Sequence, residues 1–256
     1  MIDTHCHLDA REFAADREGV VRQARAAGIT QIVVPAVAVD QFADVKNTVL
    51  AFPCCVAAYG IHPLFVGKAT EIDLTTLGLW LATENPVAVG EIGLDFYVDR
   101  SQEARQTHFF VEQLKQARRF DLPVLLHVRG AIDAVLKQLR QHKVRGGIAH
   151  AFNGSRQQAE EFIKLGFKLG FGGAMTYSGS RRIRELAATL PLTSLVLETD
   201  APDIPPAWLH RGRNAPAELA EIAQVLAELR GISRQEVTAV TSEAARHVLP
   251  GLSAKS

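Results

Sequence analysis

The feature that most constrains the fold is an alternation that repeats along the whole chain. Short apolar runs rich in β-branched residues end in polar residues, and each is followed by a longer stretch with the spacing of an amphipathic helix. The runs expected as strands are residues 1–5, 29–37, 54–60, 87–91, 124–127, 147–150, 167–171 and 195–198. The expected helices are residues 17–27, 40–51, 74–84, 101–120, 131–142, 155–165, 180–190, 215–230 and 233–249. Eight strands, each followed by a helix, predict an α/β protein with a (β/α)8 TIM barrel and an extra C-terminal helix.

A doubly wound open sheet is the alternative with the same alternation. Such a sheet usually carries a glycine-rich phosphate turn after its first strand, whereas here that strand ends in His5-Cys6-His7. Near-continuous apolar runs such as Ile32-Val33-Val34 suit parallel strands that are covered on both faces. The barrel is therefore the preferred prediction.

The length and composition agree with one barrel. A chain of 256 residues matches the roughly 250 residues of a typical TIM barrel, so we expect one domain over residues 1–256. Apolar residues make up 47% and charged residues 22% of the chain, which excludes a disordered protein. The 28 basic and 28 acidic side chains give zero net charge. This balance argues against a protein that coats nucleic acid, but not against an enzyme that contacts a few phosphates.

The cysteines and the first residues indicate the compartment. Cys6, Cys54 and Cys55 are odd in number and have no repeated spacing, so we expect reduced thiols. No cationic stretch precedes an apolar run at the start, and no run reaches the ~18 apolar residues of a membrane span. These features predict a cytoplasmic protein without a membrane partner.

Side chains that commonly bind metals fall at or just after the ends of the expected strands. They are His5, His7, Glu91, His127, His150 and Asp200. The carboxyl ends of all strands in a parallel barrel open onto one face, so these residues should converge there. His5 and His7 are two apart and can both point inward, while Cys6 points outward. Burying so many titratable groups without cations would be costly, so we predict two divalent metal ions.

An ordered series of motifs surrounds these residues. The motifs are Asp3-Thr4-His5-Cys6-His7-Leu8, Gly60-Ile61-His62-Pro63, Gly90-Glu91-Ile92-Gly93-Leu94-Asp95, His127-Val128-Arg129, His150-Ala151-Phe152-Asn153-Gly154 and Glu198-Thr199-Asp200-Ala201-Pro202. In this order, over the whole chain, they resemble the TatD family of metal-dependent hydrolases and deoxyribonucleases, which belongs to the amidohydrolase-like barrels.

The resemblance implies a role for each of these residues. His5, His7, Glu91 and Asp200 would hold one metal ion, and Glu91, His127 and His150 would hold the second, with Glu91 as the bridge. Water between the ions would attack a phosphodiester, and Asp200 would act as the general base. Glu91 and Asp200 are thus the expected catalytic residues. Ligands of this kind accept Zn, Mg, Mn or Ni.

Substrate contacts are expected near the same motifs. The resemblance places His62 close to the substrate phosphate, although a histidine that packs within a loop would give the same pattern. Arg129 follows His127 by two residues and could meet a phosphate on the same side or pair with a helix. Candidates for base stacking follow strands six to eight: Phe152, Tyr177 and Trp208. For Phe152, packing in the core is the alternative.

Two further features bear on the substrate. Arginines gather after strands seven and eight, at Arg181, Arg182, Arg184, Arg211 and Arg213. They could bind phosphates, but a solvated face is the favoured interpretation of the first three. Where the family often has His-Pro-His, this chain has His62-Pro63-Leu64, so the resemblance leaves the preferred substrate open.

The leading hypothesis is a deoxyribonuclease with 3′–5′ exonuclease action on single-stranded DNA, which it binds weakly and transiently. A small-molecule amidohydrolase or esterase and a D-aminoacyl-tRNA deacylase are alternatives on the same barrel. Related amidases often carry a carbamylated lysine where this chain has Glu91, which weakens the amidase alternative. A non-catalytic scaffold would be expected to have lost ligands, and the set is complete. No sequence feature indicates an obligate protein partner.

Overall fold

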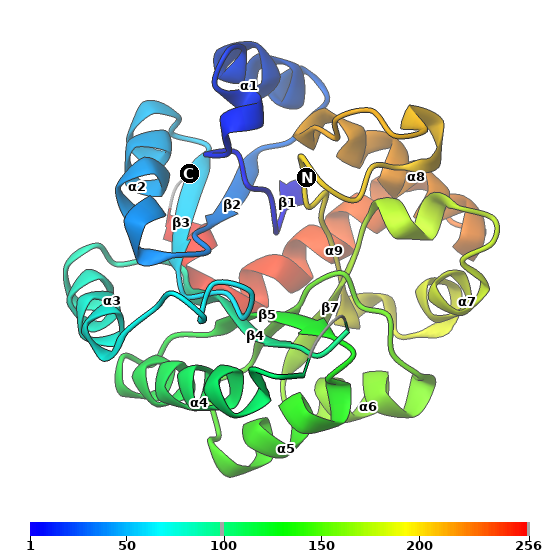
Figure 1. Cartoon of the computed structure of the whole chain (residues 1–256). Helices are drawn as coiled ribbons and strands as arrows, with labels where there is room; N and C mark the ends of the chain where they lie inside the picture. The colour runs from blue at the N-terminus through cyan, green and yellow to red at the C-terminus, as the bar shows by residue number, and fades with distance from the viewer. Residues whose placement is uncertain (98–99, 255–256) are drawn as a thin grey trace.

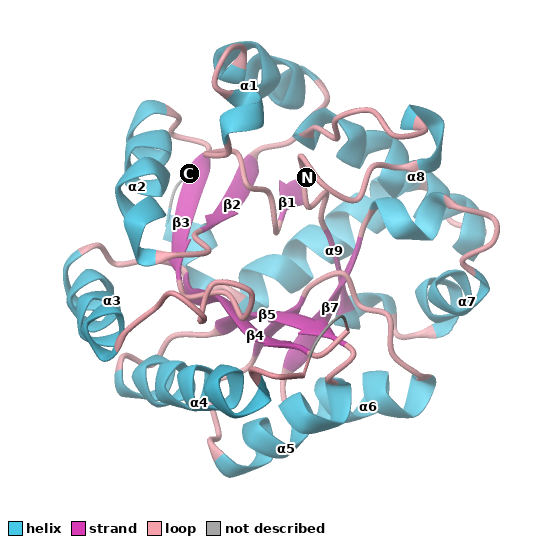
Figure 2. Ribbon diagram, viewed as in Figure 1, coloured by secondary structure: helices cyan, strands magenta, loops and turns pink. Residues whose placement is uncertain are grey.

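The computed structural model describes residues 1–97 and 100–254, so residues 98, 99, 255 and 256 of the expected domain lie outside the described residues. Within this part, eight parallel strands form one sheet in chain order. They are β1 Ile2–Asp3, β2 Gln31–Pro35, β3 Cys55–Tyr59, β4 Ala88–Asp95, β5 Val124–Arg129, β6 Gly147–Ala149, β7 Phe167–Phe171 and β8 Leu195–Leu197. The sheet curls round a central axis (Figure 2), and the predicted barrel is confirmed.

Nine α-helices occur in the described ranges. They are α1 Arg17–Ala26, α2 Phe42–Ala51, α3 Glu71–Thr83, α4 Glu103–Arg119, α5 Ile132–Gln141, α6 Arg156–Lys164, α7 Arg181–Thr189, α8 Leu219–Arg230 and α9 Arg234–Val248. Figure 1 shows α1 to α8 as a ring around the strands in chain order. Each helix turns an apolar face inward; in α5, for example, Val135, Leu136 and Leu139 are buried. None of the helices in these ranges is long and apolar enough to span a membrane.

The barrel closes between β1 and β8 through individual hydrogen bonds. The N–H and the hydroxyl of Thr4 both donate to the carbonyl of Leu197, at 3.1 and 3.0 Å. The buried Asp3 carboxylate accepts the N–H of Thr199 at 3.0 Å and its hydroxyl at 2.6 Å. The N–H of Asp200 donates to the carbonyl of His5 at 2.8 Å. This seam therefore joins the first and the last motif of the chain directly.

The extra helix α9 covers the amino-terminal end of the barrel. Figure 1 shows it passing behind the strands. Ala244, Ala245 and Val248 form a buried cluster with side chains from inside the barrel. These include Ile2, Val33, Val56, Leu125, Ile148 and Val196. Because apolar side chains fill this end, the opposite end is the one available for polar chemistry.

Two strands, β4 and β5, extend beyond their predicted ends. β4 continues to Asp95, so the prediction that Glu91 ends its strand is wrong. Residues 92–95 pair with residues 126–129 of β5, and this pairing prolongs both strands, so His127 does not end its strand either. The pairing register shifts between Val89 and Ile92, and Glu91 lies in this irregular stretch.

Candidate metal centre

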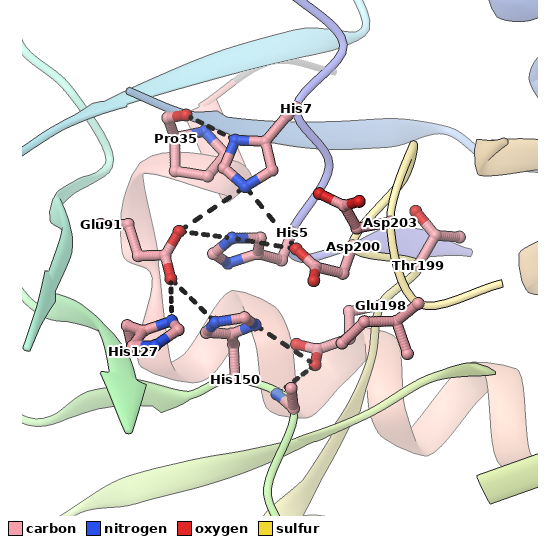
Figure 3. Close-up of polar contacts among 12 residues, drawn as sticks. His5, His7, Pro35, Glu91, His127, His150, Glu198, Thr199, Asp200 and Asp203 are labelled. Atoms are coloured by element: carbon pink, nitrogen blue, oxygen red, sulfur yellow. Dashed lines mark hydrogen bonds and ion pairs between the residues drawn. The ribbon is translucent and has the colours of Figure 1, made fainter. Parts of the chain in front are cut away.

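The Glu91 carboxylate lies at the centre of the candidate site (Figure 3). Its Oε2 atom is 3.1 Å from Nε2 of His5 and 3.6 Å from Nε2 of His7. Its Oε1 atom is 3.0 Å from Nδ1 of His127 and 2.8 Å from Nε2 of His150. The two oxygens of one buried carboxylate thus face two separate pairs of imidazoles.

Asp200 belongs to the first of these groups. Its Oδ1 atom is 3.6 Å from Nε2 of both His5 and His7. The residue has a φ of 58°, in the left-handed region that non-glycine residues rarely adopt. Its backbone bond to the His5 carbonyl holds it there. The strained turn therefore places the carboxylate beside the two histidines of the first strand.

The spacing of these atoms fits divalent ions. Ligands bound at about 2.1 Å from one ion lie about 3.0–3.4 Å from one another in octahedral or tetrahedral geometry. Within the described residues, His5, His7 and Asp200 form one group with ligand atoms within 4.8 Å, and His5, Glu91 and His150 form another. Neutral imidazole and carboxylate are also the donor types that Zn, Mn and Ni accept. The six residues expected to bind metals are therefore all brought together.

Neighbouring groups set the orientation of two imidazoles. Nδ1 of His7 is 3.2 Å from the carbonyl of Pro35, which leaves its Nε2 directed at Glu91 and Asp200. Nε2 of His127 is 3.0 Å from Oδ2 of Asp95, which leaves its Nδ1 directed at Glu91. A carboxylate or carbonyl on the far nitrogen is the usual arrangement around a metal-binding histidine.

His62 differs from the other histidines. Its Nδ1 accepts the N–H of Leu64 at 3.1 Å, so the neutral ring carries its proton on Nε2. That nitrogen lies 3.4 Å from Oε1 of Glu91. Although His62, Glu91 and His127 also lie within metal-binding distance of one another, this tautomer makes His62 a hydrogen-bond donor at the edge of the centre.

Burial and neighbouring charges determine the protonation of the cluster. Burial would raise the pKa of Glu91, but the imidazoles of His150, His62 and His5 hold the pKa well below its usual range. Burial lowers the pKa of His5 to about 3, so this ring is neutral. Burial would also lower the pKa of His150, but the Glu91 carboxylate raises it to about 10. The pKa of Asp200 is raised, chiefly by burial.

A second buried carboxylate lies beside His150. Oε1 of Glu198 accepts the N–H of Ala151 at 2.5 Å and is 3.9 Å from Nδ1 of His150. Oε2 of Glu198 and Nδ1 of His150 are buried and have no hydrogen-bond partner among the described residues. Glu198 packs against Gly170, where a Cβ would lie 2.1 Å from the carboxylate. Only glycine leaves room for it.

The centre lies at the bottom of an open cavity of about 1460 Å³. His62 and Arg129 also line this cavity, as expected for substrate contacts. The guanidinium of Arg129 stacks over the ring of Tyr97, with its carbon 4.0 Å from the ring centre.

The aromatic residues proposed for base stacking lie elsewhere. Phe152 is 4% exposed and packs edge-on against Phe162, so of its two interpretations the structure bears out core packing and contradicts base stacking. Tyr177 and Trp208 are absent from the described lining of the cavity. The hydroxyl of Tyr177 donates to the carbonyl of Pro205, and the indole N–H of Trp208 donates to Glu218.

Among the residues that the structure describes, some of the arginines considered as phosphate contacts line the cavity and others do not. Arg182 lines the cavity and donates to the side chain of Asn153 at 2.8 Å. Arg213 instead forms an ion pair with Asp16, at 2.6 Å. The residues that sequence reasoning missed are Asp95 and Tyr97, four and six positions after Glu91. Asp95 ends a motif already identified, and its position there was the available signal.

Comparison with known proteins gives consistent similarities. A family model described as TatD related DNase matches residues 2–250. The uncharacterized metal-dependent hydrolase YjjV of Escherichia coli (strain K12) is 42% identical over 239 residues, which is 92% of each protein. The 3'-5' ssDNA/RNA exonuclease TatD of Pantoea sp. (strain At-9b) is 32% identical over 256 residues, covering 97% of this chain and 98% of that protein.

Solved structures agree on the fold. The crystal structure of YjjV from Escherichia coli K12 matches with a TM-score of 0.94 and 40% identity, covering 98% of each chain. A TatD family hydrolase from Entamoeba histolytica matches with a TM-score of 0.85 at 18% identity and covers 97% of each chain.

Proposed function

Since the chain belongs to the TatD-related DNase family and is a metal-dependent hydrolase, we propose that it hydrolyses phosphodiester bonds at the 3′ end of single-stranded DNA. The observation that carries the proposal is the position of Glu91, whose two oxygens face two separate sets of imidazoles. A carboxylate shared in this way suits a pair of ions on one phosphoryl group. The relative named as an exonuclease on single strands supports the choice of substrate.

Each residue of the cluster has a role in this proposal. His5, His7 and Asp200 would hold one divalent ion, His127 and His150 the other, and Glu91 both. Bound there, the ions would supply Lewis-acid activation of water and of the phosphoryl oxygen. The Asp200 carboxylate would accept the proton of the attacking water, since burial raises its pKa and makes it a better base.

The edge of the centre would orient the substrate. The Nε2–H of His62 would donate to a phosphoryl oxygen, because the bond from Leu64 fixes the proton on that nitrogen. Arg129 would pair with a neighbouring phosphate. With zero net charge on the whole chain, binding should be weak and transient, and should involve few phosphates. We place the enzyme in the cytoplasm.

The test is turnover of a substrate panel. Purified protein is loaded with Mg, Mn or Zn and given 5′-labelled single-stranded DNA, the matching RNA, a cyclic amide, a carboxyl ester and a D-aminoacyl-tRNA. Stepwise shortening of the DNA from its 3′ end is the expected result. Glu91→Gln should abolish it, whereas Glu112→Gln, at a half-buried glutamate paired with Lys115, should not. Preferential cleavage of the amide, the ester or the aminoacyl-tRNA would overturn the proposal.

A further inference from the structure

Exposed apolar side chains gather on one side of the cavity mouth. Among the described residues, three large hydrophobic side chains that are more than a third exposed also line the cavity. They are Leu64, Phe65 and Tyr97, at 62%, 39% and 66% exposure. All three lie in the loops after β3 and β4, which are neighbours in the sheet. Exposed apolar groups around a polar centre are typical of ligand contacts.

Tyr97 and Arg129 form the polar part of the same patch. The Arg129 guanidinium covers one face of the Tyr97 ring at 4.0 Å, and Tyr97 is 66% exposed, so the described residues leave much of the rest of the ring uncovered. The carbonyl of Arg129 accepts the N–H of Phe96, but its side chain makes no hydrogen bond or ion pair within the described ranges, so the guanidinium N–H donors are available to a phosphate. We call Leu64, Phe65, Tyr97 and Arg129 the aromatic rim.

The aromatic rim is tied to the metal centre by one carboxylate. Asp95 accepts the N–H of Tyr97 on Oδ1 at 3.1 Å and contacts Nε2 of His127 with Oδ2 at 3.0 Å. Gly130 allows the two loops to meet, because a Cβ there would lie 3.1 Å from the Tyr97 nitrogen, and its φ of 65° suits glycine. The backbone of Tyr97 is therefore anchored to the same carboxylate that contacts His127.

The charges around the mouth differ between its two sides. The loops after β1 and β2 and the start of α2 contribute Asp9, Glu12, Asp40 and Asp44 to the lining, together with Arg11. The opposite side contributes Arg129 and Arg182, together with Asp133, and also Arg100, which is paired with Glu103 at 2.7 Å. A chain of phosphates is repelled by the first side and attracted by the second.

We propose that the aromatic rim is a nucleotide subsite, in which a base stacks on the exposed ring of Tyr97 and the adjoining phosphate pairs with Arg129. The inference rests on the proposed function and adds to it the path of the strand. The single strand crosses the arginine side of the mouth and ends at the metal centre, because the acidic side does not admit further phosphates. Leu64 and Phe65 supply apolar contact for the base.

The test uses the metal-loaded enzyme and oligodeoxythymidylates that each carry one abasic residue, placed at successive positions from the 3′ end. With the wild type, KM should rise about 5- to 150-fold when the missing base is the one that belongs on the rim. Tyr97→Ala should bring the ratio of KM values for abasic and intact strands close to one, and Tyr97→Phe should keep it. Tyr177→Ala, at an exposed tyrosine outside the described lining, is the matched control and should also keep it. Arg129→Ala should reduce the salt dependence of KM by about one phosphate contact.

Failure of the subsite and failure of the proposed function give different results. If the wild type degrades no oligonucleotide, the proposed function fails. The rim is tested independently by anisotropy of the same labelled strands binding to metal-free protein, where Kd should show the same abasic penalty. Two results would overturn the subsite even if hydrolysis is observed. One is an equal Kd for intact and abasic strands, and the other is an increase in Kd for the abasic strand that is the same in Tyr97→Ala as in the wild type.

Discussion

Replacement of Glu91 by glutamine tests the shared carboxylate most directly. The amide has nearly the same shape, but it has no charge, and its NH2 group cannot accept a hydrogen bond or bind a cation. Both oxygens of Glu91 face imidazole pairs at 2.8–3.6 Å, so the change affects both groups of ligands. Glu91→Gln should therefore weaken the binding of both ions.

The size of the effect follows from linkage. An ion present at 100 times its Kd stabilises the fold by about 2.7 kcal/mol, which for a chain of this length is about 5–10 °C in Tm. Loss of a hydrogen-bond partner of a metal ligand costs about 10- to 100-fold in affinity for the ion. Loss of the ligand itself should therefore cost at least about 100-fold. At the same ion concentration the variant would gain only about 0.4 kcal/mol, or about 1 °C.

The assay combines a thermal melt, with and without Mn, and elemental analysis after reconstitution. After free ions are removed, the wild type should retain two ions, Glu91→Gln none, and His7→Ala and His127→Ala one each. The ion content of the double variant, compared with that of the two single variants, shows whether the two histidines bind different ions. Two ions per chain in Glu91→Gln, or loss of the same ion in both histidine variants, would refute the shared carboxylate.

Three further outcomes are expected. Gly170→Ala should destabilise the fold by at least about 1–3 kcal/mol in urea unfolding, because its Cβ would meet the buried Glu198 carboxylate, whereas Gly179→Ala has open space and should change little. Leu249→Ala should cost about 2–5 kcal/mol in the same measurement, since Leu249 is fully buried in the cluster below the barrel; an unchanged midpoint would show that this end is not packed as described. The Glu91 carboxylate raises the pKa of His150 to about 10 against the effect of burial, so an ion that binds His150 must displace its proton. The affinity for the ion should therefore rise by about tenfold per pH unit from pH 7 to 9. Calorimetry in buffers of different ionisation enthalpy should show the proton release. Affinity that does not change with pH would contradict this protonation.

The sequence was sufficient to predict the barrel and the convergence of the six residues expected to bind metals. Apolar runs followed by amphipathic stretches report strands and helices directly, and parallel strands must place their carboxyl ends on one face. The position of α9 was not predictable, because an amphipathic helix can cover any apolar surface, including the end of a barrel. The family was also recognisable from its ordered motifs, and the comparisons confirm it.

Other features depend on distances that a pattern does not contain. The run that includes Glu91 continues as apolar residues, so nothing in it marks the register shift that places the carboxylate at the centre. The aromatic residues after strands six to eight were plausible stacking groups, but Phe152 faces the core and Tyr97 faces the mouth. Whether a ring in a loop is exposed depends on the neighbouring loops, and these come from distant parts of the chain. The roles of the individual site residues and the single-domain organisation remain predictions.

The seam between β1 and β8 also has a consequence for synthesis. It joins Thr4 to Leu197, which are 193 residues apart in the sequence, and the same seam brings His5 beside Asp200. A nascent chain that has not yet delivered residue 200 lacks Asp200 and the backbone bond that sets it beside His5. Such long-range closure is a late event in folding. The complete centre therefore exists only in a finished and closed barrel, and a truncated chain lacks it from the start.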